Sequence, residues 1–228
     1  MMGEEKDLDG FITKEGEMIS LKDTDRVSAI ILQTEDIKSA VRNLQRIAMK
    51  CQEAGYYGPA CDYIERILPL ISAPCDKAEC FLRMGIAMEH LRDFGAAEGA
   101  YSRAFDLPQQ PNEIWYFLNN NRGYCLNQIG QHQESEMYCR AAIKIQPKRH
   151  NAHKNLGIAL MSLGRIGEAA KSLIRATKLC PSDSRALAHL DELFACHREV
   201  TKEIPDFLIK LLKCHELVQR EKMPFPVQ

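Results

Sequence analysis

The sequence carries almost no net charge and has no long apolar run. Lys and Arg number 30 against 31 Asp and Glu, so the formal net charge is −1. This balance argues against bulk electrostatic binding to nucleic acid or to an anionic membrane surface. No segment approaches the roughly 20 apolar residues of a spanning helix, and the acidic start, MMGEEKDLDG, lacks the apolar core of a secretory signal. We therefore expect neither a signal nor a membrane span.

Motifs for catalysis and phosphate binding are also missing. There is no GxSxG, HExxH, phosphate loop or GxGxxG, and the carboxylates form no recognisable acid–base pair. The nine cysteines are irregularly spaced, which is no disulfide framework and favours a reducing compartment. Cys196-His197 and Cys214-His215 are adjacent pairs, whose members point about 100° apart on a helix. We expect no enzymatic activity, no cofactor, no metal site and a cytoplasmic location.

What the sequence does have is the composition and periodicity of a folded helical chain. Hydrophobic residues make up 45% and charged residues 27%, which is ordinary for a globular domain and excludes disorder of the whole chain. Between residues 36 and 220 apolar residues recur with a helical period, and Pro and Gly gather at short breaks. The pattern predicts helices at 36–54, 58–71, 76–92, 94–106, 111–129, 132–145, 149–163, 166–179, 183–197 and 204–220.

Residues 1–35 do not share this pattern. Phe11-Ile12-Thr13 and Met18-Ile19-Ser20-Leu21 have the composition of a small hairpin, but an isolated hairpin is only marginally stable in water. A mobile tail is an equally good interpretation, and residues 25–33 fit a short helix. We therefore expect an N-terminal extension that is either mobile or folded as a hairpin and helix.

The helical part contains internal repeats. Residues 120–147 and 154–181 align without a gap, at a spacing of 34 residues. The pairs that this spacing matches are Gly123 and Gly157, Leu126 and Leu160, Gly130 and Gly164, Ala142 and Ala176, and Pro147 and Pro181. An earlier copy carries Gly85, Ala97, Tyr101, Ala104 and Pro108, and a weaker first copy has Ala48, Gly55 and Ala60.

This combination of period, glycines, alanines and proline resembles the tetratricopeptide repeat. The resemblance implies an all-α fold, a right-handed superhelix of antiparallel helix pairs with a C-terminal capping helix. Small residues let neighbouring helices approach, and the proline after the second helix of each pair turns the chain. The predicted organisation is an N-terminal extension (1–35), a repeat domain (36–220) with repeats near 41–74, 78–111, 116–149 and 150–183, a partial repeat (184–197) and a cap (204–220), and a tail (221–228).

Some residues depart from the family pattern. Asn119 and Arg122 stand where the first helix of a repeat usually has apolar residues, and Asp191 stands at a small-residue position. In the repeat at 116–149 we therefore expect the first helix to pack through Trp115, Leu118 and Cys125. In the amphipathic terminal helix, the residues expected to cover the last repeat are Phe207, Leu208, Leu211, Leu212 and Leu217.

In proteins of this family, as the resemblance implies, the first helices of the repeats line a concave groove that holds an extended peptide or a partner helix. Spacings of four and three residues place one stripe of side chains on that face of each helix. The candidate groove residues are Arg46, Arg83, Ile86, Phe117, Asn121, Tyr124, Lys154, Asn155, Ile158 and Arg185.

Asn121 and Asn155 lie one repeat apart in this stripe. An Asn amide offers both donors and an acceptor, so it can pair with the N–H and the C=O of an extended backbone. Two such residues on adjacent helices predict a short asparagine ladder for a bound peptide. The alternative is a pair of solvated asparagines on an exposed face.

Arginine and lysine make the stripe more basic than the chain as a whole. Arg pairs bidentately with carboxylates, so an acidic or C-terminal-carboxylate ligand is one interpretation, and ordinary ion pairs along the helices are the other. The carboxylate clamp of chaperone-binding family members needs Lys and Asn in its first repeat and Lys and Arg in its third. The residues at those positions are Leu82 and Ile86, then Asn151 and Asn155, which argues against a receptor for chaperone tails.

Apolar residues in the stripe favour a protein partner. An apolar strip of the kind that binds helices or peptides would be formed by Leu82, Ile86, Phe117, Tyr124 and Ile158, unless neighbouring helices or residues 1–35 bury it. The favoured function is a non-catalytic adaptor that binds a peptide or helix of a partner protein, with no nucleic acid and no membrane. The alternatives are a self-assembling scaffold that forms homo-oligomers and a secretion-type chaperone of the tetratricopeptide class.

Overall fold

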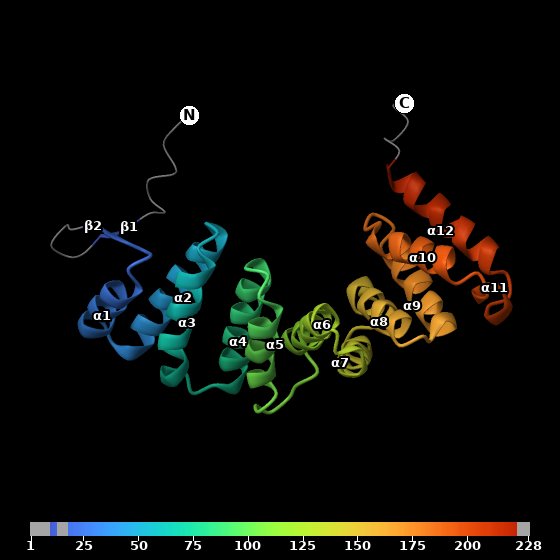
Figure 1. The fold of residues 1–228 in the computed structure, drawn as a ribbon. Helices are drawn as coiled ribbons and strands as arrows, with labels where there is room; N and C mark the ends of the chain where they lie inside the picture. The colour runs from blue at the N-terminus through green and yellow to red at the C-terminus, as the bar shows by residue number, and fades with distance from the viewer. Residues whose placement is uncertain (1–9, 13–17, 223–228) are drawn as a thin grey trace. The chain divides into compact units, whose positions relative to one another are not determined.

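A computed structural model describes residues 10–12 and 18–222 of the chain (Figure 1). The chain divides into two compact units, residues 1–109 and 110–228, which we call unit 1 and unit 2 and describe separately. Most of the predicted tail at 221–228 lies outside the described residues. In the part of the chain that is described, no helix is both long enough and apolar enough to cross a membrane.

Unit 1 begins with a two-stranded antiparallel hairpin and continues with helices. Strand β1 (Gly10–Ile12) pairs with β2 (Met18–Ser20), and Phe11 lies opposite Ile19. The helices that follow are α1 (Thr24–Thr34), α2 (Ile37–Glu53), α3 (Tyr57–Ile67), α4 (Pro74–His90) and α5 (Phe94–Ala104), with a 3-10 turn at Leu68–Leu70.

The N-terminal segment packs on the first helix pair of unit 1. Helix α1 contacts both α2 and α3, and the buried Tyr63 hydroxyl of α3 donates a hydrogen bond to the Leu21 carbonyl at 2.9 Å. Ile19, Val27 and Ile31 are buried. The described part of residues 1–35 therefore contributes apolar side chains to the core of unit 1.

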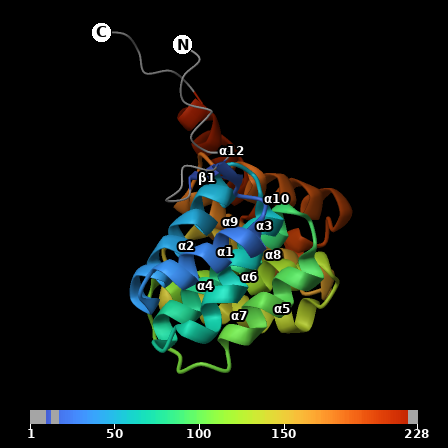
Figure 2. The same ribbon diagram turned by 90° about the vertical axis from the view of Figure 1, so that its left-hand side faces the viewer.

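Helices α2 and α3 form one pair of unit 1, and α4 and α5 form the next. Figure 2 shows α2 and α4 on one side of this unit and α3 and α5 on the other. Gly85 allows α4 to approach α5, because a Cβ atom at this position would lie 2.1 Å from the Tyr101 ring. Tyr101 is fully buried, and its hydroxyl donates to Glu89 Oε1 of α4 at 2.6 Å.

Unit 2 is also built of helix pairs. Its helices are α6 (Glu113–Gln128), α7 (His132–Ile145), α8 (His150–Ser162), α9 (Ile166–Leu179), α10 (Arg185–Cys196), α11 (Val200–Glu203) and α12 (Phe207–Lys222). A Cβ atom at Gly123 would lie 2.6 Å from Cys139 Sγ, and one at Gly157 would lie 2.6 Å from Leu173 Cγ. Both positions therefore have room only for the hydrogen of a glycine. Gly130 and Gly164 adopt φ values of 82° and 73°, which turn the chain between the two helices of a pair.

The first helix of unit 2 accommodates its unusual polar residues as predicted. Trp115, Leu118 and Cys125 are buried. Asn119 is buried as well, and its Nδ2 donates to the Trp115 carbonyl at 2.7 Å, so its amide is satisfied within its own helix. Arg122 lies over the Tyr138 ring at 4.2 Å.

Helix α12 covers the last pair through Phe207 and Leu211, as predicted, and through two further residues that were not predicted. Phe207, Leu211, Cys214 and Val218 are buried at spacings of four, three and four residues. The prediction was wrong for Leu208 and Leu212, which are 49% and 62% exposed because they lie on the outer side of α12. Leu217 is half-buried.

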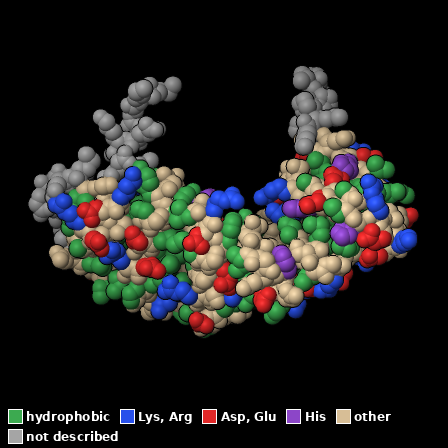
Figure 3. Space-filling view, viewed as in Figure 1, with side chains coloured by type: hydrophobic (Ala, Val, Ile, Leu, Met, Phe, Trp, Pro, Cys, Tyr) green, Lys and Arg blue, Asp and Glu red, His purple; other side chains and the backbone are tan. Residues whose placement is uncertain are grey.

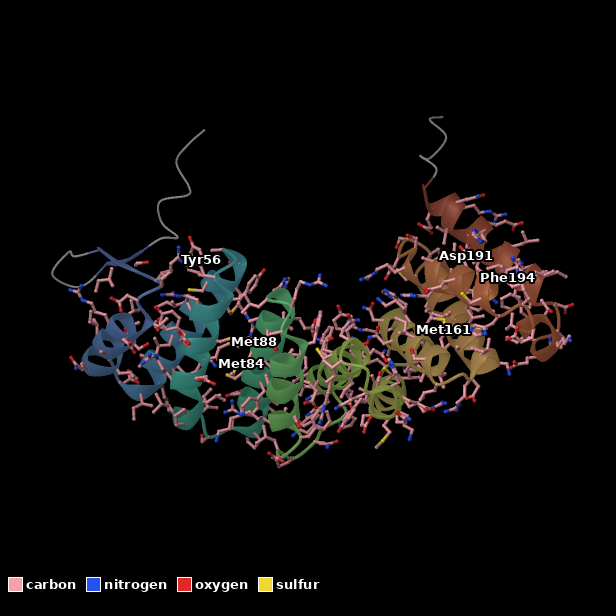
Figure 4. All side chains as sticks on the ribbon, viewed as in Figure 1. Tyr56, Met84, Met88, Met161, Asp191 and Phe194 are labelled. Atoms are coloured by element: carbon pink, nitrogen blue, oxygen red, sulfur yellow. The ribbon has the colours of Figure 1, made fainter. Side chains whose placement is uncertain are left out.

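Helix α12 also explains the unusual Asp191. Figure 4 shows Asp191 and Phe194 on α10, beside α12. Asp191 Oδ1 lies 2.8 Å from His215 Nε2, and the Phe194 and Phe207 ring centroids are 5.4 Å apart. A small residue is not needed at position 191, because a capping helix with a polar partner packs there.

Candidate partner-binding face

The first helices of the unit 2 pairs, α6, α8 and α10, carry most of the predicted groove residues. Helix α8 packs against both α6 and α10. Helical spacing places the predicted side chains on one side of each helix. Most of them are half-buried, and Arg185 on α10 is exposed. We call this set the unit 2 face; it consists of Phe117, Asn121, Tyr124, Lys154, Ile158 and Arg185.

Asn155 does not belong to this surface. It is only 3% exposed, and its Nδ2 lies 3.2 Å from Asn120 Oδ1 and 3.4 Å from the Asn120 carbonyl. Asn120 Nδ2 in turn donates to Asn121 Oδ1 at 2.9 Å. The expected surface position of Asn155 is thus corrected: α6 and α8 pack closely, and the amide is used between them.

The asparagine contacts continue below the surface. Asn127 Nδ2 donates to the Asn155 carbonyl at 2.9 Å, and His132 Nδ1 lies 3.2 Å from Asn127 Oδ1. Asn155 Oδ1 is buried without a hydrogen-bond partner among the described residues. Asn121 is therefore the surface end of a connected chain of amides that holds α6 against α8.

Lys154 is also more buried than expected, with 8% exposure. Burial lowers its pKa, as does the neighbouring Arg185, while Asp183 acts in the opposite direction. Asp183 lies in the loop before α10. Its Oδ1 and Oδ2 accept from Arg185 Nε at 2.8 Å and Nη2 at 2.7 Å, and His150 Nε2 lies 3.1 Å from Oδ2.

Asp183 was absent from the predicted site although the sequence signals it. Asp183 is the first residue of the helix predicted at 183–197, and a carboxylate at the start of a helix can accept bonds from first-turn amides. The Arg185 backbone N–H donates to Asp183 Oδ1 at 3.1 Å. The hydrogen bonds from Arg185 lower the pKa of Asp183, and burial raises it. The hydrogen bonds have the larger effect, so the pKa of Asp183 lies well below its usual range.

Asp183→Asn is expected to lower the free energy of unfolding at neutral pH by about 1–3 kcal/mol, because charged hydrogen bonds are lost. A depressed folded-state pKa contributes stability that is complete above the unfolded-state value of about 4 and disappears as the pH falls below it. Urea unfolding at neutral pH and at steps down to about pH 2 should show the difference from the wild type shrinking. Glu216→Gln on the exposed side of α12 is the control; a difference independent of pH would contradict the assignment.

The predicted groove residues of unit 1 form a separate surface on α2 and α4. Arg46 is exposed, Ile86 is half-buried, and Arg83 pairs with Glu79 at 2.7 Å. A small pocket of about 100 Å³ lies between the two helices; its lining residues are Gln45, Met49, Glu79, Cys80 and Arg83. Because Glu79 neutralises Arg83, this surface is less basic than the sequence suggested.

The cysteines provide no reactive thiol in the core. Burial raises the pKa of Cys51, Cys61 and Cys80 to about 11 and that of Cys139 to about 12, so these thiols stay protonated at neutral pH. Within residues 10–12 and 18–222, no group of three His, Cys, Asp or Glu side chains is arranged to hold a metal ion. Figure 3 shows charged side chains of both signs scattered over the visible surface of each unit.

Comparison with known proteins agrees with this architecture. Residues 118–149 and 151–183 match the tetratricopeptide repeat family. The chain is 37% identical over 107 residues to the small glutamine-rich tetratricopeptide repeat-containing protein 2 of Mycosarcoma maydis. It is 29% identical over 99 residues to tetratricopeptide repeat protein 37 of Xenopus laevis. These matches cover 47% and 42% of this chain but only 29% and 6% of the two relatives.

Solved structures share the fold. MamA of Desulfovibrio magneticus superposes with a TM-score of 0.65 at 18% identity, covering 81% of this chain and 97% of that one. YrrB, described as a tetratricopeptide repeat protein with an unusual peptide-binding site, gives a TM-score of 0.59 at 17% identity, covering 82% and 98%. Residues 118–149 and 151–183 are therefore tetratricopeptide repeats, and proteins with such repeats mediate protein–protein interaction.

Proposed function

We propose that unit 2 is a non-catalytic docking module that binds an extended segment of a partner protein along the unit 2 face. The observation that carries the proposal is the composition of this face. Two successive first helices, α6 and α8, present partly exposed apolar side chains, Phe117 and Ile158, beside the amide of Asn121. Apolar anchors beside a few oriented polar groups are typical of surfaces that recognise peptides.

The support beneath the face favours binding without rearrangement. Asn121 is held by Asn120, which is held by Asn155 on the next helix. A side chain whose position is already fixed loses little conformational entropy when a ligand binds. The peptide-binding site named for YrrB, a protein of the same fold, supports a peptide as the ligand class.

The Asn121→Ala, Ile158→Ala double variant is expected to bind partner peptides at least about tenfold more weakly than the wild type, since it removes one polar contact and one apolar contact. The ligands are peptides selected by the wild-type chain from a random display library, with affinity measured by fluorescence polarisation. Met137→Ala on α7 is the matched control, because Met137 is 67% exposed on the second helix of a pair.

Circular dichroism establishes that all variants are folded. Equal affinity of the double variant and the wild type would place binding elsewhere on the chain. A wild-type chain that selected no peptide at all would contradict the proposed function itself.

A second candidate function is self-association through the outer side of α12. Leu208, Ile209 and Leu212 are 49%, 52% and 62% exposed, and together they form an apolar patch on one side of this helix. In this case the occupant is a second copy of the chain. Light scattering should then show a mass that rises with concentration for the wild type and stays at the monomer value for Leu212→Lys.

A further inference from the structure

We infer that the unit 2 face binds a carboxylate of the partner segment, in a site formed by Lys154 of α8 and Arg185 of α10. This inference rests on the proposed function and names the chemistry of the ligand. Charged residues of three different segments meet at this point: His150 and Lys154 on α8, Asp183 in the loop before α10, and Arg185 at the start of α10.

Arg185 is oriented by its neighbour and presented to solvent. Asp183 accepts from its Nε and Nη2 atoms, and His150 contacts the same carboxylate. The side chain of Arg185 is nevertheless 68% exposed, whereas that of Asp183 is only 12% exposed. The carboxylate thus serves as the inner support, and the guanidinium is the part that an incoming group meets.

Lys154 provides the unusual feature of the site. Lys154 as a whole is 8% exposed. Within residues 18–222 no hydrogen bond or ion pair to its ammonium group is found, and Nζ does not belong to the side-chain atoms that are fully buried without a partner. Partial burial disfavours the charged form of the ammonium group, because the protein replaces part of the water that would solvate it. The groups that act on it electrostatically are Arg185, which is also positive, and Asp183, which is negative. An anion bound beside Arg185 would offset this effect.

The charge of the site favours a carboxylate over a phosphate. Lys154 and Arg185 carry two positive charges and Asp183 one negative charge, so one positive charge remains while His150 is neutral. A carboxylate carries one negative charge and pairs with a guanidinium. A phosphate monoester carries about −1.5 to −2 at neutral pH, which exceeds the charge available. Tyr124 of α6 also interacts electrostatically with Arg185.

The test uses the full-length chain and peptides selected from a random display library. Each selected peptide is resynthesised with its Asp or Glu changed to Asn or Gln, with phosphoserine at the same position, and with a free or an amidated C-terminus. We expect the amide forms to bind the wild type at least about tenfold more weakly, as expected for loss of a charged contact. The C-terminal pair distinguishes a side-chain carboxylate from a terminal one.

Lys154→Met and Arg185→Gln are expected to bind the acidic and the amide peptides with nearly equal affinity, so the preference disappears. Lys171→Met, which removes an exposed lysine from α9, should keep the preference. If the wild type bound the amide or the phosphoserine peptides as tightly as the acidic ones, the carboxylate site would be overturned while the docking module remained. If no peptide were selected, both proposals would fail together.

Stability separates a binding lysine from a packing lysine. Met keeps the length and apolar stem of Lys154 but removes a charge that partial burial disfavours, so we expect the thermal midpoint of Lys154→Met to be unchanged or higher than that of the wild type. A lower midpoint with undiminished preference for acidic peptides would make Lys154 a packing residue and overturn the inference.

Discussion

Phe207→Ala is expected to lower the free energy of unfolding by about 3–5 kcal/mol, the range for removing a large aromatic side chain from a core. Phe207 is the first residue of α12 and is 1% exposed. It packs against Phe194 and belongs to the cluster that joins α9, α10, α11 and α12. Its loss would leave a cavity among these helices.

Leu208→Ala is the matched control, because Leu208 is the next residue in the same helix but is 49% exposed. We expect its free energy of unfolding to lie within about 0.5 kcal/mol of the wild type. Urea unfolding followed by far-ultraviolet circular dichroism measures both. Equal effects of the two variants would show that α12 does not pack through the stripe described here.

Gly85→Ala is expected to destabilise unit 1 by about 1–3 kcal/mol, although alanine favours a helix more than glycine does. The new Cβ atom would meet three ring atoms of Tyr101 at 2.1, 2.3 and 2.6 Å. The ring is fully buried, and its hydroxyl is bound to Glu89. It can therefore move only by breaking that bond or by separating α4 from α5.

Gly99→Ala, in the same unit, is expected to change the stability in the opposite direction. Gly99 lies inside α5, and a Cβ atom there has no neighbour within 4 Å. Helix propensity then acts alone, and the variant should be more stable than the wild type by about 0.5–1 kcal/mol. Thermal and urea unfolding of the three chains gives the ranking. If both alanine variants shifted in the same direction, packing at Gly85 would not be the reason for its glycine.

The fold could be predicted from the sequence because the residue patterns that define it are local and repeat along the chain. Helical periodicity, glycines at crossings and turns, and prolines after helices are all visible in single segments. The breaks predicted near Gly130 and Gly164 are turns with positive φ. The predicted repeats are confirmed by the family match over 118–149 and 151–183, and the all-α class is confirmed by the solved structures of this fold.

The surface residues could be predicted less well, because exposure depends on which side of each helix is covered by a neighbouring element. Asn155 and Lys154 share the stripe spacing of exposed residues, but contacts of α8 with α6 and with the loop before α10 bury them. Leu208 and Leu212 have apolar side chains like those that face the core, and only the position of α12 shows that they do not. A single sequence does not show how each helix is rotated about its own axis relative to its neighbours.

The amide chain from Asn121 to Asn127 has a consequence for binding thermodynamics. It runs through two adjacent helices, so a shift of α8 relative to α6 would break several hydrogen bonds at once. The two helices therefore resist sliding past each other, and a ligand seated across them meets a stiff support. If a partner segment binds the unit 2 face as proposed, its affinity should depend on the flexibility that the segment loses, and rigid or cyclised peptides should bind more tightly than flexible ones.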